Sequence, residues 1–106
     1  MIITSGYNIA SAEVEEALLQ HDAVSECGVV GIPDQMRSEI VKAFVVLKSG
    51  YDPSDKLVEE LQNYVKQTIA PYKYPRSIEF CSRLPRTETN KLQRFKLRDA
   101  VKRRPR

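Results

Sequence analysis

Hydrophobic positions recur along the chain at two spacings, one typical of helices and one typical of strands. Val14, Ala17, Leu18 and His21 follow the i, i+3, i+4, i+7 spacing of a single helix face. Ser11 stands where an N-cap belongs, and acidic residues follow it in the first turn, near the positive end of a helix. We therefore expect a short amphipathic helix that begins near Ser11.

A second helix is predicted after Asp52-Pro53-Ser54-Asp55, which supplies an N-cap, a proline at the first helical position and an acidic first turn. Its apolar face runs through Leu57, Leu61, Tyr64, Val65 and Ile69, and Pro71 ends it. A third helix, which is basic, is expected from Leu92 to about Lys102 around two apolar positions, Leu97 and Val101.

Three runs are typical of strands. The first two, Val24 to Ile32 and Ile40 to Leu47, are rich in β-branched residues. Pro33 and Asp34 begin the segment between them and favour a turn, so these two runs are expected to pair antiparallel. The third run, Ser77 to Ser82, alternates apolar and polar positions and predicts one more strand.

The order of these elements, after a short extended N-terminal segment, is α-β-β-α-β-α. It predicts an α+β domain with a small sheet of about three strands flanked by helices. A length of 106 residues suits one domain with one core. We expect that domain to span residues 1–102, and residues 103–106 to form a basic tail without fixed structure.

Composition excludes several classes of protein. The chain is 42% hydrophobic, and no apolar run approaches the ~20 residues of a membrane span. The N-terminus lacks the basic and apolar regions of a secretion signal. Cys27 and Cys81 lie far apart and, with the single His21, form no metal-binding spacing, so no metal site is expected. Both cysteines are expected to be buried free thiols.

The formal net charge of +3 conceals a gradient along the chain. Residues 1–41 carry a net charge of −6, residues 42–85 carry +2 and residues 86–106 carry +7. A basic end of this kind attracts nucleic acid, an acidic lipid surface or a phosphorylated small molecule. The charge does not choose among these three partners.

Two loops carry candidate chemistry. Ser5-Gly6-Tyr7-Asn8 places a glycine directly before a helix, where backbone can approach a ligand closely. The loop from Pro85 to Lys91 is rich in hydroxyls and has Asn90 where a left-handed turn residue belongs. Taken alone, the first loop is an ordinary turn and Lys91 is a solvated lysine. The four glycines form no phosphate-binding loop, so a nucleotide would be bound only with help from elsewhere.

Five segments in order carry a family resemblance: "SGYNIASAEVEEALLQHDAV", "ECGVVGIPD", "IVKAFVVL", "APYKYPRSIEF" and "LPRTETNKLQRFKLR". From Ile2 to Val101 the chain resembles the C-terminal domain of the adenylate-forming enzymes. This superfamily includes acyl- and aryl-CoA synthetases, firefly luciferases and peptide-synthetase adenylation domains. The wording of "APYKYPR" and "KLQRFKLR" is most similar to the medium-chain acyl-CoA and benzoate-CoA ligase branch.

The resemblance implies a two-step reaction. A carboxylate attacks the α-phosphate of Mg-ATP to give an acyl-adenylate and pyrophosphate, and the CoA thiol then displaces AMP. ATP, Mg and the acid would be bound mainly by a larger N-terminal domain of the same chain, the expected partner. The 106 residues then correspond to a mobile lid that presents a different face in each half-reaction and is inactive by itself.

The resemblance also assigns roles to particular residues. Lys91 matches the catalytic lysine, which would reach the substrate carboxylate and the ATP-derived oxygens in the first step. In the second step Ser5, Gly6 and Tyr7 would line the tunnel for the pantetheine arm. Arg37, Lys66, Tyr74, Pro75 and Arg76 match positions that contact the CoA nucleotide.

Two positions depart from the family pattern. Asn90 stands where most relatives have glycine, and asparagine tolerates the left-handed conformation better than other residues with a side chain. Asn8 stands where the related medium-chain enzymes have an arginine that contacts ATP. We therefore expect a weaker fit at Asn90 without loss of function, and the sequence leaves the ATP contact at position 8 open.

Two alternatives remain open from the sequence. A small basic nucleic-acid-binding module would show exposed aromatic residues with interleaved bases on a sheet face. A lid from a carrier-protein adenylation domain or a luciferase-like oxygenase would share the fold but not use CoA. The expected compartment is the cytoplasm, or the mitochondrial matrix for an animal source. The acid itself is not predicted, because the resemblance places its pocket in the N-terminal domain.

Overall fold

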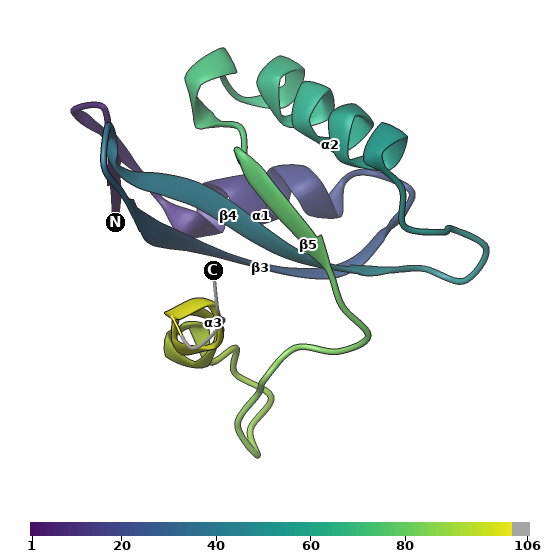
Figure 1. Cartoon of the computed structure of the whole chain (residues 1–106). Coiled ribbons are helices and arrows are strands. Elements are labelled where there is room, and N and C mark those ends of the chain that lie inside the picture. Colours follow the sequence, from purple (N-terminus) through teal and green to yellow (C-terminus); the bar gives the residue numbers. More distant parts are fainter. Residues whose placement is uncertain (103–106) are drawn as a thin grey trace.

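The computed structural model describes residues 1–102, in which helices cover both faces of one five-stranded sheet (Figure 1). Helices α1 and α2 pack on one face, and α3 packs on the other. The predicted α+β class is therefore confirmed. The elements in chain order are β1 (Ile2–Thr4), β2 (Tyr7–Ile9), α1 (Ser11–Leu19), β3 (Val24–Asp34), β4 (Ser38–Leu47), α2 (Asp55–Thr68), the short 3-10 helix η1 (Pro71–Lys73), β5 (Ser77–Phe80) and α3 (Arg94–Lys102).

Strand β4 is the centre of the sheet. On one side it pairs antiparallel with β3 along its whole length, as the sequence predicts. On the other side it pairs antiparallel with β1 at Ser38 and then parallel with β5 from Lys42 to Val45. The β1–β2 hairpin, the β3–β4 turn and the chain entering β5 therefore meet at the start of β4.

The sheet has two more strands than the three predicted, because the N-terminal segment forms a hairpin. Strands β1 and β2 pair antiparallel around Ser5 and Gly6, whose φ angles are 49° and 83°. Two consecutive residues with positive φ are typical of the tight hairpin turn that matches strand twist. Strands of three residues are too short to show a period of two, so the sequence shows only an extended segment.

Three helix boundaries differ from the predicted ones. Ser54 rather than Asp52 caps α2, since its hydroxyl accepts a hydrogen bond from the Leu57 amide at 3.0 Å. Ser11 is the first helical residue of α1, whose N-cap, Ala10, has no side-chain cap. Helix α3 begins two residues after Leu92, because Leu92 pairs with Arg86 in an isolated bridge.

Two apolar clusters lie on opposite faces of the sheet. Adjacent residues of β3 belong to different clusters: Val29 packs with α1 and α2, and Val30 packs with α3. The larger cluster contains Ile2, Ile9, Val14, Ala17, Leu18, Val24, Cys27, Val29, Val41, Ala43, Val45, Leu61 and Val65. The smaller one contains Val30, Phe44, Leu84 and Leu97. Within residues 1–102, helices therefore cover both faces of the sheet.

Several expectations about composition can be compared with the structure. Cys27 is a buried free thiol as predicted, whereas Cys81 is free but only half-buried. Among residues 1–102 no helix has the length and apolar character to cross a membrane. In the same part of the chain, His, Cys, Asp and Glu side chains form no group of three or more that could hold a metal ion. The expected tail, residues 103–106, lies outside the described residues.

Candidate functional site

The predicted site residues lie at two separate places in the domain. One group surrounds the start of β4, and the other is the hairpin that precedes α3. In Figure 1 the β1–β2 turn lies at the upper left, in purple, and the hairpin that carries Lys91 lies at the bottom, in yellow-green. The domain thus presents two candidate surfaces rather than one.

The first surface begins with two turns that contact each other. The backbone amide of Ser5 donates to the carbonyl of Arg37 at 2.9 Å, and Nη1 of Arg37 donates to Oγ of Ser5 at 3.2 Å. A carboxylate oxygen of Asp34 accepts from the Arg37 amide at 3.0 Å and fixes the β3–β4 turn. Arg37 is therefore held beside the β1–β2 turn that contains Gly6.

Aromatic stacking extends this surface to η1. Tyr7 follows the turn and is 52% exposed, and its ring stacks on that of Tyr72 with centroids 4.4 Å apart. Beside Tyr72, Lys73 forms an ion pair with Glu13 of α1, and this carboxylate raises the pKa of Lys73. The sequence did not predict that Tyr72 lies beside Tyr7, because only the folded chain brings η1 to β2.

The remaining predicted residues of the first surface gather around one ring. Nζ of Lys66 lies 4.3 Å from the ring centroid of Tyr74, and the guanidinium carbon of Arg76 lies 5.0 Å from it. Contacts of this kind between a cation and an aromatic face are attractive. Pro75 is buried, and its carbonyl accepts a hydrogen bond from Gln62 at 3.0 Å. Pro75 therefore fixes the backbone between Tyr74 and Arg76.

The second surface is the hairpin that carries Lys91. The Thr87 amide donates to the Lys91 carbonyl at 2.9 Å, and the Lys91 amide donates to Oγ1 of Thr87 at 3.0 Å. Asn90 has a φ of 65°, so the predicted left-handed turn residue is confirmed. Lys91 is exposed at the end of this turn. Its ammonium has no hydrogen bond or ion pair to any described residue.

Four charged residues near this hairpin were not identified from the sequence: Glu15, Glu26, Arg86 and Arg94. They form two arginine–glutamate ion pairs, one before and one after Lys91. The partners are 60 and 79 residues apart in sequence. The charge gradient was the one available signal, since an acidic first part and a basic last part attract each other when they meet.

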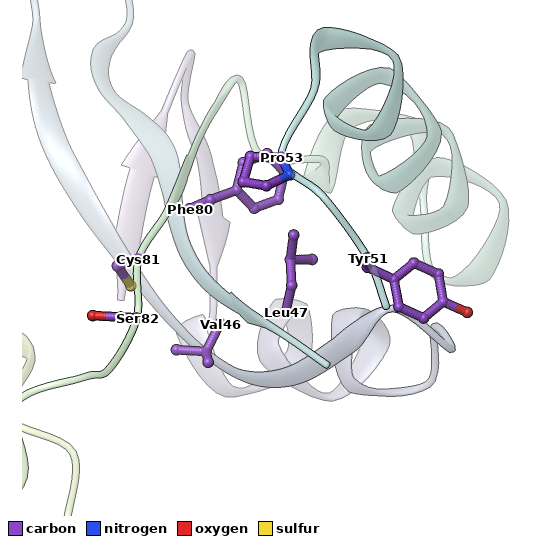
Figure 2. A pocket seen from close by; sticks show the side chains of 7 residues that line it. All are labelled: Val46, Leu47, Tyr51, Pro53, Phe80, Cys81 and Ser82. Carbon is purple, nitrogen blue, oxygen red and sulfur yellow. The ribbon is translucent and has the colours of Figure 1, made fainter. Parts of the chain in front are cut away.

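A pocket of about 370 Å³ lies at the end of β4, away from both surfaces (Figure 2). It is lined by Val46, Leu47, Tyr51, Pro53, Phe80, Cys81 and Ser82. Cys81 is its one thiol, and burial raises the pKa of that group, which makes it a weak nucleophile at neutral pH. None of the predicted site residues lines this pocket, so it is not the candidate site.

The domain is similar to proteins of a known family. Residues 13–91 match the family described as AMP-binding enzyme C-terminal domain. The mitochondrial acyl-coenzyme A synthetase ACSM2A of Homo sapiens is 55% identical over 102 residues, which are 93% of this chain and 18% of the relative.

Two solved structures have the same fold. An acyl-CoA synthetase of Brucella canis gives a TM-score of 0.92 at 50% identity, over 93% of this chain and 18% of that one. A benzoate CoA ligase of Burkholderia xenovorans gives a TM-score of 0.81 at 48% identity, over 90% of this chain and 19% of that one.

The 106 residues thus span about a fifth of the length of the relatives they match. The family match covers most of the chain, and it ends at Lys91, the lysine of the exposed hairpin. The relatives that carry the matching domain are acyl-CoA synthetases and ligases. The chain therefore belongs to the AMP-binding enzyme C-terminal domain family.

Proposed function

We propose that this domain serves a ligase that activates a carboxylic acid with ATP to an acyl-adenylate and then transfers the acyl group to CoA. The observation that carries the proposal is the separation of the two candidate surfaces on one domain (Figure 1). A single active site cannot contact both surfaces at the same time. It can use them one after the other if the domain turns between steps. Two steps with different chemistry, each served by one surface, account for this arrangement.

In the first step Lys91 would act at the active site formed with the N-terminal domain. Its ammonium is exposed on a hairpin whose turn is fixed by hydrogen bonds, so it can enter a site on another domain. A cation placed there stabilises the negative charge that develops as the carboxylate attacks the α-phosphate. Mg²⁺ would be held by the N-terminal domain, where it would neutralise phosphate charge.

In the second step the first surface would face the active site. A side chain built at Gly6 would meet no atom within 4 Å, and this open space supports a place for the thiol arm beside the turn. Arg37, Lys66 and Arg76 supply three cations suited to the phosphates of CoA. The ring of Tyr74 lies against two of these cations, Lys66 and Arg76, and holds them close to each other.

The domain alone would be inactive, because the acid pocket and the ATP phosphate loop would belong to the N-terminal domain. For the compartment we propose the cytoplasm, or the mitochondrial matrix for an animal source. The human relative is a mitochondrial enzyme. We propose that the acid is selected outside these 106 residues.

The test is the Lys91→Ala variant of the full-length enzyme. ATP–pyrophosphate exchange should fall by about a hundredfold or more, the scale of losing one electrostatic contact in a transition state. Thioester formation from supplied acyl-adenylate should be retained. Lys96→Ala, which removes another exposed lysine five residues further on, should leave both reactions intact. Equal loss of both half-reactions in Lys91→Ala would contradict the proposal.

A further inference from the structure

The hairpin that carries Lys91 is tied to the sheet by Arg86, the residue that begins it. Nε and Nη2 of Arg86 donate to one carboxylate oxygen of Glu26, on β3, at 3.0 and 2.6 Å. Nη1 of the same guanidinium donates to the carbonyl of Asn90 at 3.3 Å. One side chain therefore connects the turn directly before Lys91 to a strand of the sheet.

A second arginine holds the chain on the other side of Lys91. Arg94, the first residue of α3, donates from Nε and Nη2 to the two carboxylate oxygens of Glu15, with the Nε contact at 3.0 Å. One of these oxygens also accepts from the Val29 amide at 2.8 Å. The side chain of Glu15 is only 12% exposed. Helix α1, strand β3 and helix α3 thus meet at a single carboxylate.

Few other directional contacts hold this segment. Within the described chain, the backbone hydrogen bonds of residues 82–93 are local, such as those between Thr87 and Lys91 and from Gln93 to Pro85. Leu84 and Leu92 belong to or pack against the smaller apolar cluster. Apolar contacts are non-directional, so they do not fix the orientation of the hairpin. Two planar guanidinium groups, each with more than one hydrogen bond, do fix the orientation of this segment.

Stability alone does not account for the Arg86–Glu26 ion pair. The side chains of the Arg86–Glu26 pair are 27% and 40% exposed, and pairs this accessible to water contribute little to the free energy of unfolding. Both pairs instead join the acidic first part of the chain to the basic residues on either side of Lys91. Their placement is better explained by control of where the lysine points.

We propose that Glu26 and Glu15 are positioning residues for Lys91. Acting through Arg86 and Arg94, they hold the hairpin so that the ammonium reaches the reacting groups during adenylate formation. The proposal rests on the proposed function, since it requires that Lys91 acts in that step. A misplacement of about 1 Å at a reacting group costs roughly a hundredfold in rate. Loosening one of two such contacts should therefore cost roughly tenfold.

The first experiment uses Glu26→Gln in the full-length enzyme, a change that keeps the shape of the side chain and removes its charge. We expect kcat for ATP–pyrophosphate exchange to fall roughly tenfold, with KM for ATP and the acid unchanged. Thioester formation from supplied acyl-adenylate should be unaffected. The matched control is Glu60→Gln, which removes the acid of the ion pair with His21 on the other face of the sheet.

A second experiment separates positioning from general structural damage. In the Lys91→Ala background, Glu26→Gln should cause no further loss of exchange, because Glu26 acts only through Lys91. Arg86→Lys keeps the charge but loses the planar guanidinium that makes several hydrogen bonds at once. It should reproduce the roughly tenfold loss of exchange. This variant also carries the test if Glu26→Gln does not fold.

Three results would overturn the positioning role: unchanged exchange in both Glu26→Gln and Arg86→Lys, an equal fractional loss when Lys91 is already absent, or a parallel loss of thioester formation. Normal exchange in Lys91→Ala would overturn the proposed function and the positioning role together. Loss of exchange in Lys91→Ala, but not in Glu26→Gln or Arg86→Lys, would overturn the positioning role alone.

Discussion

At the scale of single residues, Gly6 and Gly50 share a conformation but differ in place. Both have a positive φ, of 83° and 93°, and both leave open space where a side chain would be. Leucine at either position should therefore cause similar backbone strain, about 1–2 kcal/mol. One glycine lies in the β1–β2 turn of the first candidate surface, and the other lies between β4 and α2.

This pair allows the thiol passage to be tested. In the full-length enzyme, Gly6→Leu should abolish thioester production and retain ATP–pyrophosphate exchange, because the new side chain would stand where we propose that the pantetheine arm passes. Gly50→Leu should retain both reactions at a similar melting temperature. Thioester production by a folded Gly6→Leu variant would refute the passage, and loss of both reactions would indicate a purely structural turn.

Burial controls the chemistry of Cys27. Its thiol donates a hydrogen bond to the carbonyl of Glu15, and burial, assisted by the nearby Glu15 carboxylate, raises its pKa from the ordinary 9.0 to about 12. Between pH 9 and 12 the unfolded chain has lost this proton while the folded chain keeps it. The free energy of unfolding contributed by Cys27 is therefore complete below pH 9 and is lost as pH rises toward 12.

Alkylation of the native protein should distinguish the two thiols. At pH 8, iodoacetamide should modify the half-buried Cys81 slowly and should leave Cys27 unmodified until denaturant is added. Peptide mapping by mass spectrometry reads both positions at once. Equal modification of the two residues in the native state would show that the burial of Cys27 is wrong.

Residues whose role is local were the ones predictable from the sequence. Asn90 was predicted as a left-handed turn residue, because that preference depends on its own side chain. Glu15 and Glu26 were not, since each acts through an arginine that is at least 60 residues away in sequence. One sequence without an alignment carries no signal for such a pairing beyond opposite charge.

At the scale of elements, the two serines near helix starts differ in what they contribute. Ser54 accepts the hydrogen bond of a true cap, whereas Ser11 lies inside α1 and caps nothing. Ser54→Ala should lower the free energy of unfolding by about 1 kcal/mol. Ser11→Ala should change it by less than about 0.5 kcal/mol. Urea unfolding of the 106-residue chain measures both, and equal losses would contradict the assignment of the caps.

The longer elements were predictable because each shows a clear period. Helix α2 and the β3–β4 pair agree with their predicted extents to within a few residues. The β1–β2 hairpin was missed because strands of three residues have no measurable period. The pattern of a single strand does not show which strand it pairs with. The parallel pairing of β5 with β4 was therefore not predictable, since it depends on the path of the chain through α2 and η1.

At the scale of the whole molecule, the fold keeps the two candidate surfaces apart. The start of β4 collects the residues suited to CoA, while the α3 side carries the lysine suited to adenylate formation. The charge gradient also acquires a structural meaning at this scale. Acids of α1 and β3 meet bases on either side of Lys91, so part of the charge gradient is used within the domain.

The division of the apolar residues into a larger and a smaller cluster bears on the order in which the chain can fold as it is synthesised. Every buried member of the larger cluster lies between Ile2 and Val65, and its last packed neighbour is Phe80. A ribosome that has released β5 has therefore supplied everything this cluster needs. The hairpin with Lys91 and α3 emerge afterwards and dock onto a surface that already exists. The hairpin with Lys91 and helix α3 are then the last described parts of the domain to be put in place.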